Sequence, residues 1–157
     1  MAGTHPARPL ELALFRTAAT WTAIGLAGGV AYREITRAQG FTGHTQLAVV
    51  HTHALVLGAL VPLIALLAAR VFDLGSPADR WFVPVWNVGL AVTVGMLTTK
   101  GLLQVLSPES ADSAALAGVA GLGHITLAAG LVLLLLALGR SLRAAPPAST
   151  HEGGSQK

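Results

Sequence analysis

GHTQLAVVHTHALVLGALVPL, residues 43–63, reads as a membrane-buried helix, because nearly every side chain after Gln46 is apolar. The same stretch carries three histidines, His44, His51 and His53. An ionisable side chain inside the bilayer is energetically costly, and such residues mark functional sites by default. The fold and the function of this chain are therefore both tied to the reason why a membrane helix holds three imidazoles.

The composition extends the membrane interpretation to the whole chain. Of the 157 residues, 53% are hydrophobic and 11% are charged, and the mean hydropathy is +0.64, outside the usual range of soluble domains. A span needs about 20 mostly apolar residues, and four stretches qualify: 10–32, 44–70, 82–106 and 113–139. Short connections predict an all-α, up-down bundle of four transmembrane helices over residues 10–143. An N-terminal arm (1–9) and a disordered tail rich in Ala, Pro, Ser and Gly (144–157) flank it.

Charge predicts the orientation. Cytoplasmic loops accumulate Lys and Arg, and one side of the predicted bundle carries the larger set of cations. Both termini are therefore expected in the cytoplasm, and no nucleic-acid partner is expected. The cations of that side are Arg8, Arg70, Arg80, Arg140 and Arg143.

The chain has no cysteine, which excludes disulfides, thiolate ligands and covalent c-type haem attachment. Nitrogen or oxygen atoms must hold any redox cofactor.

Helical geometry separates the histidines by depth and by direction. At about 1.5 Å and 100° per residue, His51 lies roughly 10 Å below His44 on nearly the same face. His51 and His53 share one depth but point about 160° apart. The fourth span carries His124 and the third carries Lys100, both expected in that same layer of the bilayer.

Each of these residues also has a purely structural interpretation. His44 suits the membrane interface, His124 could join helices by a hydrogen bond, and Lys100 could extend its amine to the headgroups. The pair His51 and His53 is harder to explain, because it would need separate buried partners on opposite faces of one helix. Imidazole is a good ligand for haem iron, copper or zinc, so the pair favours ligation.

The sequence also resembles a known family. AYREITRAQGFTGHTQLAVVHTHALVLG (31–58) and AGVAGLGHI (117–125) are similar to small bacterial four-helix membrane proteins classified as a domain of unknown function. That resemblance implies the fold and a location in the bacterial cytoplasmic membrane, and names no activity.

A more distant resemblance implies a mechanism. LAVVHTHALVLGALVPLIAL (47–66) looks like the helix of haem-copper oxidase subunit I that holds a His-x-His pair between two haems. In that superfamily twelve helices form three four-helix arcs, and the haem-binding helices come second in their arcs. The resemblance implies a homotrimer of this chain, with b-type haem between copies bound by His51 of one and His53 of the next. Arg33, Arg37 and Lys100 would then pair with haem propionates.

These expectations favour a membrane-embedded haem b protein that transfers electrons or senses a redox state or a gas, with an unidentified redox partner. Oxygen or nitric oxide reduction is not predicted, since no set of copper-binding histidines remains, and the chain is not expected to be an enzyme. Two alternatives stay open. One is a copper or zinc protein that uses His44, His51, His53 and His124; the other is a non-catalytic assembly subunit whose histidines only join helices.

Overall fold

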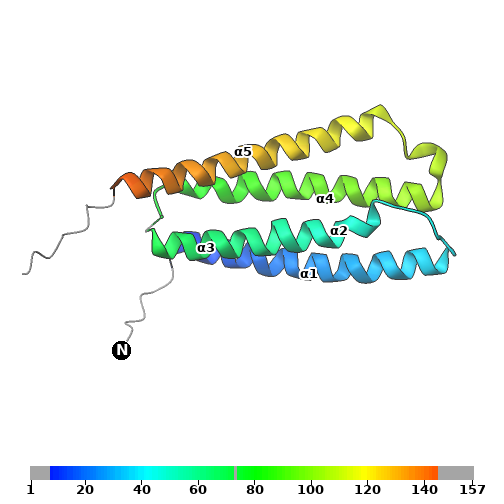
Figure 1. Cartoon of the computed structure of the whole chain (residues 1–157), viewed down its shortest axis with the longest axis horizontal. Coiled ribbons are helices and arrows are strands. Elements are labelled where there is room, and N and C mark those ends of the chain that lie inside the picture. The colour runs from blue at the N-terminus through cyan, green and yellow to red at the C-terminus, as the bar shows by residue number, and fades with distance from the viewer. Residues whose placement is uncertain (1–7, 73, 145–157) are drawn as a thin grey trace, which may run out of the picture.

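The computed structural model describes residues 8–72 and 74–144, and these form four long antiparallel helical rods (Figure 1). The first rod is α1 (Pro9–Ala38). The second runs without a break through α2 (Leu47–His53), the π-helix η1 (Ala54–Leu60) and α3 (Val61–Val71); we call this stretch, Leu47–Val71, the second helix. The third and fourth rods are α4 (Phe82–Leu106) and α5 (Ala114–Ala144). Two short 3-10 turns, η2 (Asp79–Trp81) and η3 (Pro108–Ser110), accompany the connections.

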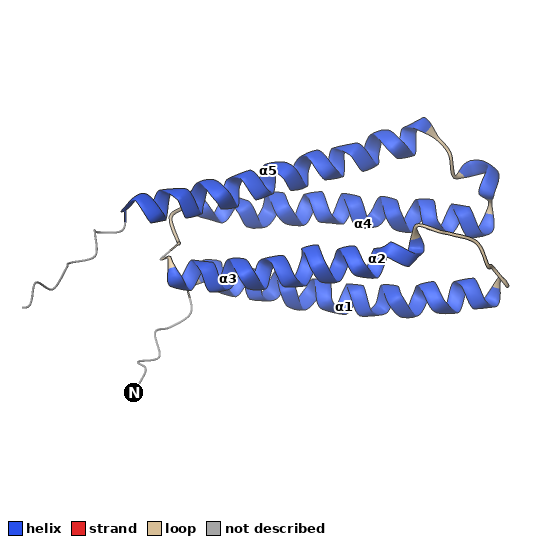
Figure 2. Cartoon of the chain, in the orientation of Figure 1, coloured by secondary structure: helices blue, strands red, loops and turns tan. Residues whose placement is uncertain are grey.

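All the regular structure in the described residues is helical, as Figure 2 shows, so the all-α four-helix prediction is confirmed. The third predicted span, 82–106, has the observed bounds of α4. Of the predicted arm and tail, the structure describes only three residues. Arg8 precedes α1, Pro9 begins it and Ala144 ends α5; the remaining residues, with His5 and His151, lie outside the described chain.

The first helix is longer than predicted. It continues past residue 32 to Ala38, so Arg33 and Arg37 lie on its last turns and not in a loop. Nothing breaks the helix before Gly40, which has a φ of +57°. Phe41 N–H donates to Thr36 O and Gly40 N–H to Arg37 O, the pattern that ends a helix at a left-handed glycine.

The second helix begins later than predicted, at Leu47. His44 therefore lies in the connection before it, exposed, and the predicted alignment of His44 with His51 on one helical face is wrong. The start is fixed by α4: Thr45 Oγ1 donates to Gly101 O at 2.8 Å, and Gln46 N–H donates to Gln104 Oε1 at 2.7 Å. These bonds to a neighbouring rod replace the helical turn that residues 44–46 were expected to form.

The four rods follow one another in chain order across the molecule (Figure 1), and α1 also contacts α4. The first rod, α1, packs along the second helix, and α5 packs along α4. Glycines allow these approaches: a Cβ on Gly58 would lie 2.3 Å from Trp21 Cβ, and one on Gly89 would lie 2.7 Å from Leu127 N. The outer rods, α1 and α5, make little or no contact with each other, so each keeps a free flank.

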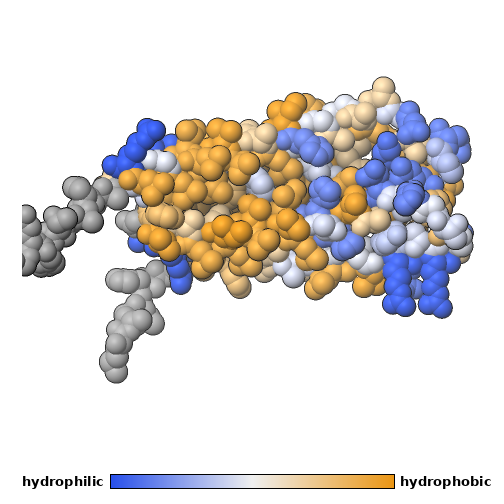
Figure 3. Space-filling view, viewed as in Figure 1, coloured by the Kyte–Doolittle hydropathy of each residue, from blue (hydrophilic) through white to orange (hydrophobic). Residues whose placement is uncertain are grey.

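Three of the rods are long and apolar enough to cross a membrane: Leu47–Val71, Asp79–Leu106 and Ala114–Ala144, of 25, 28 and 31 residues. About 20 residues suffice for a span, so these rods identify a multi-pass membrane protein. The first rod, α1, is not among the three; it carries Arg16 within its length. Figure 3 shows mostly apolar side chains over the half of this face that holds the end of α5, with hydrophilic ones at its tip and a larger hydrophilic area towards the opposite end.

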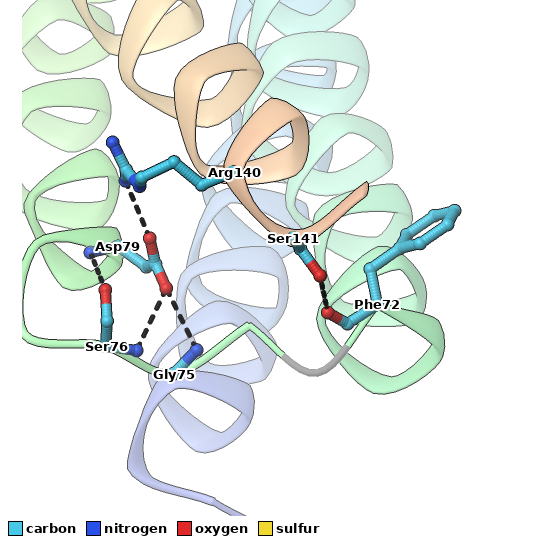
Figure 4. A network of polar contacts seen from close by, with 6 residues as sticks. All are labelled: Phe72, Gly75, Ser76, Asp79, Arg140 and Ser141. Atoms are coloured by element: carbon cyan, nitrogen blue, oxygen red, sulfur yellow. Dashed lines mark hydrogen bonds and ion pairs between the residues drawn. The ribbon is translucent and has the colours of Figure 1, made fainter. Parts of the chain in front are cut away.

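A polar network joins the elements at the end of the molecule where α1 begins and α5 ends (Figure 4). Arg140 of α5 donates to Asp79 Oδ1 at 2.8 Å, and the backbone N–H groups of Gly75 and Ser76 donate to Asp79 Oδ2 at 3.1 and 2.9 Å. The hydroxyl of Ser141 bonds Phe72 O nearby. Asp79 thus joins the connection between the second helix and α4 to the last turns of α5.

The same end holds a second ion pair, between Arg70 Nε and Glu11 Oε2 at 3.1 Å. It joins the last turn of α3 to the first turn of α1. The cations predicted to share one side of the bundle belong to elements that meet at this end: the start of α1, the last turn of α3, η2 and the last turns of α5.

Candidate functional site

The two histidines of the His-x-His pair lie on opposite flanks of the second helix. Val50, the residue before His51, is buried and packs against Gly28 of α1. His51 follows on the α1 side, where a Cβ on Gly29 would lie 3.6 Å from His51 Cβ. The predicted divergence of the two imidazoles is therefore consistent with this helix register.

His53 lies on the flank that faces α4. Gln46, seven residues earlier on the same side, bonds α4, and so does Leu57, four residues later. The ring nitrogen Nδ1 of His53 is 2.9 Å from Val49 O. A carbonyl only accepts, so Nδ1 carries the proton and the lone pair is on Nε2. Nε2 has no hydrogen bond to any residue that the structure describes, and in a neutral imidazole with this Nδ1 contact it is the nitrogen that could bind a metal.

His51 is half-buried, and its ring nitrogens are poorly paired. Within the described residues, Nδ1 is buried and has no hydrogen-bond partner. Nε2 lies 3.4 Å from the hydroxyl of Thr52, longer than an ordinary hydrogen bond. An unpaired buried nitrogen costs about 1–3 kcal/mol, which is a reason to expect a further partner for this imidazole.

The surface between the two flanks is exposed and almost wholly apolar. Thr52 is exposed between His51 and His53, and the same face continues along the second helix in large apolar side chains. The two histidines therefore border a surface of the kind that membrane helices turn to lipid or to another helix. These exposed apolar residues are Val49, Val56, Leu60, Leu63, Ile64, Leu67 and Val71.

A π-helix begins directly after the pair, at Ala54, and ends at Leu60. Its last hydrogen bond runs from Val61 N–H to Val56 O. The next residue, Pro62, has no N–H to give to Leu57 O. The indole of Trp86 donates to that carbonyl at 2.8 Å instead. Pi-helical turns are rare and occur often at functional sites.

Helix α1 and α4 are tied together behind this segment. The indole of Trp21 donates to Asn87 Oδ1 at 2.8 Å, and Asn87 Nδ2 donates to Thr17 Oγ1 at 3.1 Å. The same Nδ2 donates to Val83 O at 2.8 Å. These bonds hold the two neighbours of the second helix at fixed positions, and thereby position both histidine flanks.

The remaining predicted site residues lie elsewhere. His124 is on α5, facing a pocket towards α4, and His44 is exposed in the first connection. No group of three or more His, Asp or Glu side chains in residues 8–72 and 74–144 could hold a metal ion. The four histidines expected for copper or zinc therefore do not form one site within a single chain.

The predicted cationic partners of a cofactor lie at the end away from the termini. Arg33 and Arg37 are exposed on the last turns of α1, and Arg33 Nε is 3.9 Å from Glu34 Oε1. Lys100 Nζ lies 3.4 Å from Asp112 Oδ1. The sequence gives no signal for this pair, because Lys100 is on α4 and Asp112 is in the connection before α5.

Comparison with known protein families shows which family this chain belongs to. Residues 12–141 match the family described as protein of unknown function, DUF2871. The chain belongs to this family. The matched DUF2871 region contains the whole second helix, the histidine pair, His124 and Arg140. Neither the curated proteins nor the solved structures give a match.

Sequence reasoning missed two features of the site, the π-helix and the buried hydroxyl of Thr93 in α4, which has no partner in the described residues. Pro62 was a signal for the first, because a proline inside an apolar span displaces the helical hydrogen bonds. No sequence signal marked the second.

Proposed function

We propose that this DUF2871 protein is a membrane-embedded b-type haem protein, in which haem is bound between copies of the chain by His51 and His53. All four rods would span the bacterial cytoplasmic membrane, α1 included, with both termini in the cytoplasm. The single observation that carries the proposal is the His-x-His pair, with its two incompletely paired imidazoles bordering an apolar exposed face.

The protonation state supports ligation at His53. Histidines that bind metal commonly donate the other ring N–H to a carbonyl, which fixes the ring and raises the basicity of the ligating nitrogen. The contact between His53 Nδ1 and Val49 O has that form. His51 has no such bond, and its orphaned Nδ1 fits an imidazole whose final position depends on a partner outside the chain.

The opposed directions support a site between copies. Because His51 and His53 point about 160° apart around one helix, they would hold separate haem groups, each between His51 of one copy and His53 of the next. A closed ring of identical chains makes all such sites equivalent. Helices α1 and α5 have little or no contact with each other, which leaves a flank of each for neighbours. The proposed number, three, follows from the resemblance to the arcs of haem-copper oxidases.

The chemistry of such a site is one-electron transfer. His51 of one copy and His53 of the next would hold the haem, and the bound haem would exchange electrons. The apolar residues beside the pair exclude water, and a dry environment is one of the factors that set a haem potential. Arg33 and Arg37, which lie on a rod bordering His51, would supply cations for propionates.

The test is haem content in alanine variants. His51→Ala and His53→Ala should each remove at least nine-tenths of the haem that co-purifies with the wild-type chain, measured per chain by the pyridine haemochrome absorption. His44→Ala is the matched control, since His44 is exposed in a connection, and should keep wild-type haem. Equal haem in all four proteins would refute the assignment, and stoichiometric copper or zinc without iron would favour a metal site instead.

A further inference from the structure

A cavity of about 620 Å³ lies at the end of the molecule where α5 ends. Sites for small molecules commonly have about 300–1,000 Å³, so this cavity could hold part of an organic ligand. Its walls come from the end of the second helix, the connection that follows and the last turns of α5. The lining side chains that decide its chemistry are Val71, Phe72, Ser76, Asp79, Arg140 and Leu142.

The cavity lies where the helices leave the hydrocarbon of the bilayer. Helix α5 has 31 residues, which is about 46 Å of helix against about 30 Å of hydrocarbon. Charged side chains avoid the hydrocarbon, so Arg140 and Arg143 place the excess length in the last turns. The candidate span Leu47–Val71 ends at the same cavity. A ligand there can keep one part among the headgroups and another in the hydrocarbon.

Arg140 is held in place by a carboxylate that is itself fully engaged. Asp79, with a side chain 8% exposed, accepts from Arg140 Nη2 and from the backbone N–H groups of Gly75 and Ser76 (Figure 4). The Arg140 side chain is 54% exposed. A guanidinium has five N–H donors, and those not bonded to Asp79 have no partner among the described residues. The cavity therefore offers a ligand a fixed guanidinium with unused donors.

Positive charge at this end exceeds what the carboxylate offsets. Arg80, beside Asp79, and Arg143, one turn after Arg140, are exposed, and neither forms an ion pair with a residue that the structure describes. Guanidinium groups match the geometry of phosphate oxygens. Basic pockets between membrane helices bind anionic lipid headgroups. The charges thus favour an anionic ligand that carries a phosphate.

The remaining wall of the cavity is apolar and borders exposed apolar side chains. Val71, Phe72 and Leu142 line the cavity, and all three are exposed. A free phosphate ion would leave these side chains uncovered. The glycerol and the first methylene groups of a phospholipid would cover them, which is favourable in proportion to the apolar area buried.

We propose that this cavity binds the headgroup of an anionic phospholipid from the leaflet in which α5 ends. The phosphate would accept hydrogen bonds from Arg140 and from the hydroxyl of Ser76, whose oxygen accepts from Asp79 N–H and whose proton remains to be donated. The acyl chains would run along Val71 and Leu142. The site does not include the histidine pair, so this proposal and the haem proposal can fail separately.

The test measures binding of dioleoylphosphatidylglycerol to the purified full-length protein in a neutral detergent, by native mass spectrometry. The wild type should bind it about tenfold more tightly than dioleoylphosphatidylcholine, which has no net charge. Glycerol 3-phosphate, which has a phosphate but no acyl chain, should not displace the lipid. Equal binding of the two lipids, or displacement by glycerol 3-phosphate as expected for a free-phosphate site, would overturn the proposal.

A pair of variants at Leu142 isolates the effect of charge in the cavity. Leu142→Glu should weaken binding of phosphatidylglycerol about tenfold, because its carboxylate repels the phosphate. Leu142→Gln has nearly the same shape without the charge and should bind nearly as the wild type does. Ala78→Glu, exposed at the same end but outside the lining, is the control. No loss in Leu142→Glu, or an equal loss in Ala78→Glu, would refute binding in the cavity.

A conservative variant tests the guanidinium itself. Arg140→Lys keeps a positive charge for Asp79 but loses the planar fork of donors. It should unfold close to the wild-type temperature and bind phosphatidylglycerol about tenfold more weakly, the loss of one charge-assisted hydrogen bond. Wild-type affinity in a folded Arg140→Lys protein would contradict a phosphate bound at Arg140.

Discussion

A neutral imidazole in a membrane helix is tolerated when both ring nitrogens have partners, and the two histidines of the second helix do not meet that condition. His53 has one good bond, to Val49 O at 2.9 Å, and His51 has a long one, to Thr52 at 3.4 Å. Each ring nitrogen without a hydrogen-bond partner destabilises the folded protein, and apolar packing does not offset that cost. The chain keeps both residues where a ligand or another copy can reach them, at the borders of an exposed apolar face.

A single indole illustrates how the site is supported. Trp86 is buried and donates to Leu57 O, the carbonyl that Pro62 leaves without a donor. Trp86→Phe should destabilise the protein by about 1–3 kcal/mol, the cost of a buried carbonyl without a partner. Trp81→Phe, at an exposed tryptophan of η2, should have little effect. The stability of both variants can be measured in detergent by thermal unfolding, monitored by circular dichroism. Equal stability of Trp86→Phe and Trp81→Phe would contradict the role of the Trp86 indole as donor to Leu57 O.

The second helix is built from three segments, and each end of it is fixed by a different neighbour. Its start is bonded to α4 through Thr45 and Gln46, and its last turn is paired with α1 through Arg70. The π-helix between them allows the two α-helical parts to keep separate registers. The histidine pair lies in the part that α4 positions.

Gly101 in α4 allows the start of the second helix to pack closely against α4. A Cβ on Gly101 would lie 2.4 Å from Leu47 N, whereas one on Gly95, in the same helix, would meet nothing within 4 Å. Gly101→Ala should therefore cost about 1–3 kcal/mol, as overpacking does, and should lower haem content with it. Gly95→Ala should be neutral or stabilising, since alanine is the better helix former. The unfolding temperature and the haem content per chain of both variants test this prediction. A Gly101→Ala protein as stable and as rich in haem as the wild type would contradict it.

The helices were predictable from sequence because apolar length alone defines a membrane span, and α4 was placed with its observed ends. The ends of other rods were not, because they depend on contacts between elements. Thr45 and Gln46 reach α4 and delay the second helix, and Gly40 ends α1 later than hydropathy suggests. The histidine pair was visible as a motif, but the unpaired nitrogen of His51 and the hydroxyl of Thr93 follow only from three-dimensional packing.

The two ends of the four-helix molecule differ in charge and in polarity. The end that holds Asp79 and Arg140 also holds Arg70, and hence the larger share of cations. The opposite end holds the connections after α1 and α4 and a more hydrophilic surface (Figure 3). The excess of cations near the termini favours placing that end in the cytoplasm.

This orientation can be tested with single cysteines, because the chain has none of its own. Ser110→Cys, in η3, should react with a membrane-impermeant maleimide in intact cells. Ala78→Cys, in the connection before η2, should react only after the membrane is made permeable. Both positions are exposed, so neither result would reflect burial. The reverse pattern would show that the protein has the opposite orientation.

The most direct test of the central claim is the absorption and electron paramagnetic resonance spectrum of the purified, oxidised wild-type protein. We expect a Soret band that sharpens and shifts on reduction, with a low-spin ferric signal typical of two imidazole ligands on one haem iron. A colourless protein from haem-replete cells, or a high-spin signal from iron with a single histidine ligand, would contradict it.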